Sequence, residues 1–222
     1  MSPELINILL RALGETIQMV ALSAAIGTIL GVPLGIFLAT SGRGELFAAP
    51  LANKVLGFVV NIVRSTPFII LVVAIIPFTR LVVGTSIGTA AAVVPLCVAA
   101  TPFIARIVET AVREVDQGLV EAAIAMGATP FQIVRKVLLA EAMPGIILGL
   151  TLSVVSLVAN SAMVGAVGGG GLGDLGIRYG YQRFMPEVMA AVVIVLVVLV
   201  QGLQSLGEYL ARRANKRARV TV

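Results

Sequence analysis

Long apolar runs separated by short polar connections make up most of the chain. Five runs are long enough to cross a bilayer, whose hydrocarbon core of about 30 Å requires roughly 20 apolar residues in a helix. These runs are continuous and lack the ten-residue alternation of a membrane β-strand. The pattern therefore predicts five transmembrane helices, at about 16–39, 55–77, 87–105, 146–167 and 188–206.

The composition favours the same class of protein. Of the 222 residues, 59% are hydrophobic and 12% are charged, and the mean hydropathy is +1.06. Soluble domains are about 45–50% apolar and about 25% charged. We therefore expect an all-α, polytopic integral membrane protein in which residues 1–222 form one transmembrane domain. The first run is too long for the core of a signal peptide, so we expect it to be retained.

The residue types exclude several kinds of chemistry. The chain has no His, which removes histidine triads and imidazole metal sites. Its single cysteine, Cys97, allows no intrachain disulfide and is interpreted as a buried thiol. The basic residues flank the apolar runs instead of forming one patch, which argues against nucleic-acid binding. We expect no catalytic residue, cofactor or metal.

Basic residues are distributed unequally between the two sides of the predicted helices. If the C-terminus is cytoplasmic, the inner segments hold eleven of the sixteen Lys and Arg residues, the outer segments hold four, and Arg64 lies within a span. The positive-inside rule then predicts the N-terminus outside and the C-terminus inside. The basic run from Arg212 to Arg219 is interpreted as an anchor on the anionic inner leaflet.

Small residues recur at every fourth position of the first predicted helix. Gly27, Gly31 and Gly35 share one face of it. Such a stripe lets a second helix approach closely. We therefore expect helix packing, and no separate activity, at this face.

The only long polar connection covers about 106–145. Its spacing predicts two amphipathic helices, one over about 117–126 and a second that runs to about Glu141. Pro144 and Gly145 are expected to close the second helix and to start the fourth span. Two interpretations remain open: a solvated interfacial loop, or a helix–turn–helix that docks on a partner.

The turn between these two helices contains residues that end the first helix and start the second. Gly127 is placed to end the first helix with a positive φ. Thr129 is predicted as N-cap of the second helix, with Pro130 at its first position and Gln132 completing a capping box. The turn would form the protruding tip of the loop.

This loop resembles the EAA loop of the permease subunits of binding-protein-dependent ABC importers. The resemblance rests on Glu121, Ala122 and Ala123, on Gly127, and on the run 137–139. It departs from the family at Ala140, where a proline is usual. The resemblance implies a coupling helix that enters a groove on an ATPase subunit, through Glu121, Ala122, Ala123, Met126, Gly127, Ala128, Thr129, Pro130 and Gln132.

Longer matches are similar to the methionine-uptake permeases of bacteria. They lie at 64–68, 76–80, 84–88, 125–130 and 168–173. The resemblance implies a type I importer permease in the bacterial cytoplasmic membrane, with D- or L-methionine or a close analogue as substrate. Five helices are few for enclosing a pathway, so we expect a homodimer. It would bind two ATPase subunits and an extracytoplasmic methionine-binding protein, and ATP hydrolysis would lie outside this chain.

Glycines at 168, 170 and 173 formally match a dinucleotide-binding fingerprint. They follow a predicted membrane helix instead of a strand, and no Walker A sequence occurs. The segment is therefore interpreted as a flexible external loop near the mouth of the pathway, and nucleotide binding is rejected.

Two groups of polar residues within or beside the spans are candidates for the pathway. Arg64, with Ser65 and Pro67 beside it, is either a functional charge inside the second span or an interfacial residue before a helix that starts near Pro67. In the second case Ser65 or Thr66 would cap that helix. Near the end of the fourth span, Asn160, Ser161 and Met163 are either helix-packing residues or a gate.

Three alternatives remain to be distinguished from a methionine importer. One is an ABC permease for another small polar solute. A second is an ion-coupled carrier, which would place acidic residues at membrane depth, whereas the acids here fall outside or at the ends of the spans. The third is a scaffold protein with no transport role, which would not need a capped, protruding loop.

Overall fold

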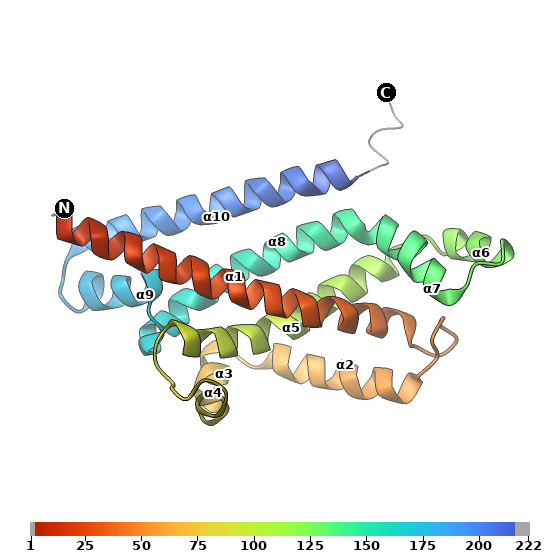
Figure 1. The fold of residues 1–222 in the computed structure, drawn as a ribbon, viewed down its shortest axis with the longest axis horizontal. Helices are drawn as coiled ribbons and strands as arrows, with labels where there is room; N and C mark the ends of the chain where they lie inside the picture. The colour runs from red at the N-terminus through yellow and green to blue at the C-terminus, as the bar shows by residue number, and fades with distance from the viewer. Residues whose placement is uncertain (1–2, 216–222) are drawn as a thin grey trace.

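The computed structural model describes residues 3–215, all of whose regular elements are helical. Four long helices lie side by side along the long axis: α1 (Pro3–Thr40), α5 (Thr89–Arg113), α8 (Leu139–Val164) and α10 (Pro186–Ala214) (Figure 1). Helix α1 packs mainly on α5, α5 on α8, and α8 on α10. The remaining elements are α2 (Pro50–Ser65), α3 (Phe68–Ala74), α4 (Ile76–Val83), α6 (Gln117–Ala125), α7 (Pro130–Ile133), η1 (Val134–Leu138), η2 (Gly165–Gly169), α9 (Gly171–Leu175) and η3 (Gly176–Tyr181).

The glycine stripe of α1 lies directly against α5, as predicted. A Cβ on Gly31 would stand 2.8 Å from the carbonyl oxygen of Thr101, and one on Gly27 would stand 2.9 Å from the Cβ of Ala100. Gly35 similarly faces the backbone of Ala105. The absence of side chains on this face is what lets the two helices approach so closely.

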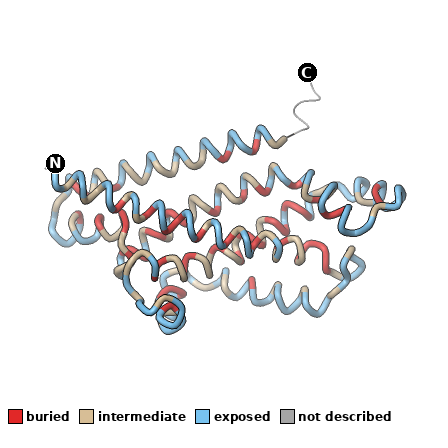
Figure 2. Tube along the Cα trace, in the orientation of Figure 1, coloured by how far each residue is buried: buried red, intermediate tan, exposed pale blue. Residues whose placement is uncertain are grey.

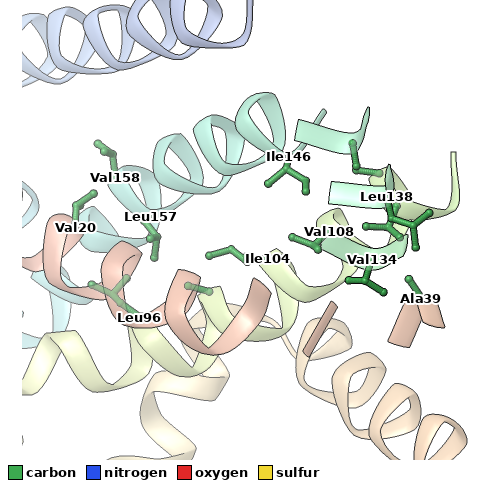
Figure 3. Packing of buried hydrophobic residues seen from close by; sticks show 14 of the residues in the cluster. Val20, Ala39, Leu96, Ile104, Val108, Val134, Leu138, Ile146, Leu157 and Val158 are labelled. Carbon is green, nitrogen blue, oxygen red and sulfur yellow. The ribbon is translucent and has the colours of Figure 1, made fainter. Parts of the chain in front are cut away.

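The main core follows the contact between α1, α5 and α8. Buried residues such as Val20, Leu96, Ile104 and Leu157 pack together there, and the core continues to Leu138 of η1 (Figure 3). The outer faces of α2 and α10 are instead mostly exposed (Figure 2). Large apolar side chains such as Phe58 and Val198 stand on these faces, 65% and 66% exposed. Such faces require lipid or a partner.

Four segments of the described chain are long and apolar enough to cross a membrane. They are Pro3–Thr40, Thr89–Arg113, Pro130–Gly169 and Pro186–Ala214, and the pair α2 and α3 would supply a fifth crossing if it counts as one span. Helix α1 begins well before the predicted boundary at 16, and α5 continues beyond 105 to Arg113.

The second predicted span is not one continuous helix, so the prediction of an unbroken helix over 55–77 is wrong. Helices α2 and α3 meet at an angle of 104°. Thr66 is extended, with φ −80° and ψ 125°, because the ring of Pro67 disfavours a helical conformation in the preceding residue. A further break at Ile75 separates α3 from α4. The apolar run showed the length of this segment, but its path depends on the proline.

The second helix of the long loop runs without a break into the fourth span. Helix α7, the π-helical turn η1 and α8 form one continuous rod, and Pro144 lies inside α8. The expectation that Pro144 and Gly145 end a helix is therefore wrong. Proline costs one backbone hydrogen bond inside a helix, and the packing of α8 between α5 and α10 is sufficient to keep the rod helical.

The glycine-rich segment 168–173 is packed and hydrogen-bonded, which corrects the prediction of a flexible loop. Gly168, Gly170 and Gly171 have φ between +75° and +90°, a region that favours glycine. They turn the chain from η2 into α9, and the backbone N–H of Leu172 then donates to Thr16 Oγ1 at 2.9 Å. The positive φ values serve to bury the segment against α1.

The first and last helices have their free ends at opposite ends of the molecule. Helix α1 begins at the end opposite to α6 and α7, whereas α10 ends on their side (Figure 1). Of the basic run interpreted as a membrane anchor, Lys216, Arg217 and Arg219 lie outside the described residues.

Candidate functional site

The connection between α5 and α8 is a compact helix–turn–helix. Asp116 caps α6 by accepting a hydrogen bond from the Gly118 N–H at 2.7 Å. The helix ends at Ala125, and Gly127 follows with a φ of +79°, as the sequence predicts. Both ends of α6 are therefore fixed by local hydrogen bonding and backbone geometry.

The start of α7 forms the predicted capping box. The Gln132 N–H donates to Thr129 Oγ1 at 3.4 Å, and the Thr129 N–H donates to Gln132 Oε1 at 2.9 Å. Pro130 occupies the first turn, where the missing N–H costs nothing. The turn between α6 and α7 is thus held in one conformation.

The predicted docking residues divide into an inner and an outer set. Ala123 is buried in the core together with Ile133, and this anchors both short helices. Glu121 and Ala122 are exposed, as are Gly127, Thr129, Pro130 and Gln132, while Ala128 is half-buried. At the tip, Met126 is 81% exposed and Phe131 is 67% exposed.

Phe131 was not among the residues predicted from the sequence. Its exposed apolar side chain follows the turn that Met126 precedes, at a place where a solvated loop would carry polar residues. The signal was an aromatic residue directly after a predicted N-cap and proline. A rigid turn with two exposed apolar side chains is able to enter a groove on another protein.

A second candidate site is a cavity of about 290 Å³ between α2, α3, α5 and α8. Arg64 and Asn160, both predicted as pathway residues, line it together. The guanidinium of Arg64 lies 6.0 Å from the centre of the Phe103 ring, within reach of a cation–π interaction. The remaining lining residues are Val63, Thr66, Phe68, Leu71, Ala99, Ala100, Phe103, Ser153, Ser156 and Leu157.

Other predicted pathway residues lie outside this cavity. Ser65 and Pro67 are exposed and do not line it, and Met163 is 48% exposed further along α8. Ser161 is buried and donates to the carbonyl oxygen of Val158 at 2.7 Å, which lies on the same helix, so the choice between helix packing and a gate stays a prediction.

Two polar side chains at the bend between α2 and α3 bond to the last carbonyls of α2. Ser65 Oγ donates to the Asn61 carbonyl at 2.8 Å, and Thr66 Oγ1 donates to the Ile62 carbonyl at 3.1 Å. Neither side chain caps α3, so the interpretation of Ser65 or Thr66 as an N-cap is wrong. Helix α3, at seven residues, is about 10 Å long, and a span that began at Pro67 would not cross a bilayer as one helix.

Sequence reasoning identified Asn160 but missed two serines of α8 that line the cavity, Ser153 and Ser156. Ser153, Ser156 and Asn160 share one face of α8, at spacings of three and four residues. This spacing was visible in the sequence, but serines are common in membrane helices and only the fold shows which face is enclosed.

Sequence reasoning also missed a charged cluster at the end of α5. Glu109, 7% exposed, lies between Arg106 at 2.6 Å and Arg113 at 3.3 Å. Arg106 further donates to the Gly57 carbonyl at 3.2 Å and to Asn61 Oδ1 at 2.9 Å, both on α2. These residues were expected in the long polar connection, whereas the extension of α5 to Arg113 places them in a hydrogen-bonded contact with α2. Charges buried in this way are tolerated because they are paired.

Comparison with known proteins identifies the chain at the level of a family. Residues 31–216 match the family described as the inner membrane component of binding-protein-dependent transport systems. The probable D-methionine transport system permease protein MetI of Vibrio cholerae is 54% identical over 211 residues, which cover 95% of this chain and 94% of that protein. The D-methionine transport system permease protein MetI of Escherichia coli K12 is 50% identical over 165 residues, covering 74% and 76%.

Solved structures agree with this assignment. A chain of the MetNI methionine ABC transporter, in an inward-facing conformation, superposes with a TM-score of 0.94 at 48% identity, covering 97% of this chain and 100% of that chain. An amino acid ABC transporter solved with histidines gives a TM-score of 0.78 at 20% identity over 94% of each chain, which shows the shared fold alone. The match over 31–216 and the apolar helices together show that this all-α, multi-pass chain belongs to the family of inner-membrane components of binding-protein-dependent transport systems.

Proposed function

We propose that this chain is the permease subunit of an ATP-driven importer of methionine. The observation that carries the proposal is the rigid, capped turn between α6 and α7, which exposes Met126 and Phe131 at one end of a membrane helix bundle. The 54% identity to a protein described as a D-methionine permease supports the choice of substrate.

One chain has too few membrane helices to enclose a pathway by itself, so the importer requires an assembly. Two copies would enclose a pathway on a two-fold axis, in which the exposed apolar faces meet each other or lipid. One ATPase subunit would bind at each α6–α7 turn, and a methionine-binding protein would dock at the opposite end. The chain would lie in the bacterial inner membrane with its N-terminus outside and its C-terminus inside.

The α7–η1–α8 rod is the element that would transmit force. The turn that would contact the ATPase is continuous with α8, and α8 carries Ser153, Ser156 and Asn160 at the cavity. Closure of the two ATPase subunits on ATP would draw the two turns together and tilt both rods. Access to the pathway would then change from one side of the membrane to the other, and hydrolysis on the partner subunits would reset it.

The test is uptake of labelled methionine by proteoliposomes that contain this chain, its ATPase and its binding protein. We expect uptake that requires ATP and persists when an ionophore abolishes ion gradients. Uptake that ignores ATP and collapses with the ion gradient would establish a secondary carrier instead. ATP-driven uptake of a different small solute, without methionine, would leave the importer and reject the substrate.

Docking of the ATPase is tested at the turn itself. An added Cβ at Gly127 would have no neighbouring atom within 4 Å, so a Trp side chain in Gly127→Trp has room to project outward from the turn and should block the partner. Gly84→Trp is the matched control, because Gly84 has nearly the same φ and equally open surroundings. We expect co-purification of the ATPase to be lost in the first variant and kept in the second.

A further inference from the structure

We propose that Arg64 binds the carboxylate of the transported amino acid inside the cavity between α2, α3, α5 and α8. This inference rests on the proposed importer function and assigns a specific contact to it. It follows from the depth of Arg64, from the unpaired polar groups that face it, and from the shape of the cavity.

Arg64 is a charge deep in the predicted membrane segment. It lies ten residues beyond Lys54 on the same helix, which corresponds to about 15 Å. That distance is about half of a 30 Å hydrocarbon core. A guanidinium at such depth is costly and is expected to face a polar pathway or an anionic partner.

No carboxylate of the described residues pairs with Arg64. Its one recorded partner is the Phe103 ring, and the salt bridges within residues 3–215 involve other arginines. Arg106 and Arg113 show the contrast, because they share the buried Glu109. Arg64 is exposed and free of a carboxylate partner, so an anion that pairs with it would come from outside this part of the chain.

The wall of the cavity formed by α8 offers further donors that have no partner. Ser153 is 1% exposed, and its Oγ makes no hydrogen bond within the described residues. A buried hydroxyl in this state costs free energy until a ligand or water satisfies it. Asn160 lies seven residues along the same face and lines the same cavity. Hydroxyl and amide donors opposite a guanidinium suit the two oxygens of a carboxylate.

The broken helix brings these groups into one space. Transporters often bind their solutes near mid-membrane, where helices are interrupted. Here the 104° bend between α2 and α3 directs Arg64 and Thr66 into the cavity lining. Hydroxyl groups close the last turn of α2, so the interruption does not leave its carbonyls bare.

The volume of the cavity and its apolar lining residues indicate which class of ligand it would hold. Its volume of about 290 Å³ is at the lower limit of the roughly 300–1,000 Å³ of drug-sized pockets. A single amino acid is a ligand of that scale. Leu71 and Leu157 also line the cavity and give an apolar side chain a surface to pack on. An amino acid with a short apolar side chain would place its carboxylate beside Arg64 and its side chain against Leu71 and Leu157.

The inference is tested by protection of a cysteine in the cavity of the assembled complex. The reporter is Ala99→Cys in a Cys97→Ala background, because Ala99 lines the cavity and carries no polar group of the proposed site. Its labelling by a methanethiosulfonate reagent is timed with methionine, with methioninol, which has an alcohol in place of the carboxylate, and with neither. If this variant fails to assemble, Val63→Cys on the opposite wall replaces it.

We expect methionine to slow the labelling about tenfold and methioninol to leave it unchanged. Arg64→Gln should abolish the protection, Arg64→Lys should keep part of it, and the control Arg80→Gln, on α4 outside the cavity, should keep all of it. Equal protection by methionine and methioninol, or full protection in Arg64→Gln, would overturn the inference. Methionine uptake by the complex with Arg64 intact tests the importer function separately, so uptake without protection rejects only the carboxylate site.

Discussion

The backbone N–H of Gly171 donates to the carboxylate of Glu15 at 2.9 Å, across 156 residues of chain. The next N–H, of Leu172, donates to Thr16 in the same way. Two adjacent side chains of α1 thus hold the start of α9, and the positive φ of Gly171 directs its N–H toward them. The glycine-rich segment is fixed to α1 by these bonds.

Replacing Glu15 by Ala should loosen this attachment. A hydrogen bond to a charged group contributes about 1.5–3 kcal/mol, and the side chain is 31% exposed, so solvent screening should reduce the loss below that range, to about 1 kcal/mol. The bridge from the 84% exposed Arg11 adds little. Thermal unfolding of the purified chain in detergent measures the effect. Glu4→Ala, at an exposed position of the same helix, serves as the control, and an equal loss there would show that the Gly171 contact is not responsible.

The close approach of α1 and α5 makes a second prediction. Gly31→Ala would place a Cβ 2.8 Å from the Thr101 carbonyl oxygen and 2.9 Å from the Cβ of Ile104, and neither of these atoms can move far without shifting α5. Overpacking of this kind costs about 1–3 kcal/mol. Gly14→Ala in the same helix has no atom within 4 Å of the added carbon, and it should be neutral or stabilising by up to about 1 kcal/mol. Denaturation midpoints of both variants decide the point, and similar midpoints would contradict the proposed packing.

The exposed tip of the loop predicts a binding defect without a stability defect. Phe131→Ser removes an apolar side chain that is 67% exposed, so the fold should lose little, whereas co-purification of the ATPase should fall at least tenfold because central aromatic contacts dominate interfaces. Phe184→Ser alters an even more exposed phenylalanine outside the loop and should leave ATPase binding intact. Normal recovery of the ATPase with Phe131→Ser would place the contact elsewhere.

The loop could be predicted from the sequence in detail because its signals are local. Thr129 and Gln132 bond to each other's backbone, the ring of Pro130 fixes its φ, and Gly127 tolerates the positive φ that ends α6. The glycine stripe of α1 was predictable for a similar reason, since spacing alone places Gly27, Gly31 and Gly35 on one face.

The cavity and the bends could not be predicted in this way because they depend on tertiary contacts. Pro67 breaks a span, whereas Pro144 is accommodated inside one, and only the packing around each proline distinguishes them. Glu109 appeared to be a loop residue until α5 was seen to continue past it. Ser153 became a candidate only when α2 and α3 enclosed the face it occupies.

Met163 provides the last prediction, which concerns a gate. Its side chain is 48% exposed on α8 in the single chain, and a flexible thioether on each of two copies would seal a pathway on their shared axis. Met163→Ala should therefore admit methionine to vesicles without ATP and raise ATPase activity in the absence of the binding protein. Met163→Leu, which keeps the volume, should preserve the seal. Met143→Ala controls for loss of an exposed methionine elsewhere on the same helix, and a complex that stays tight and unstimulated with Met163→Ala would assign this residue to packing alone.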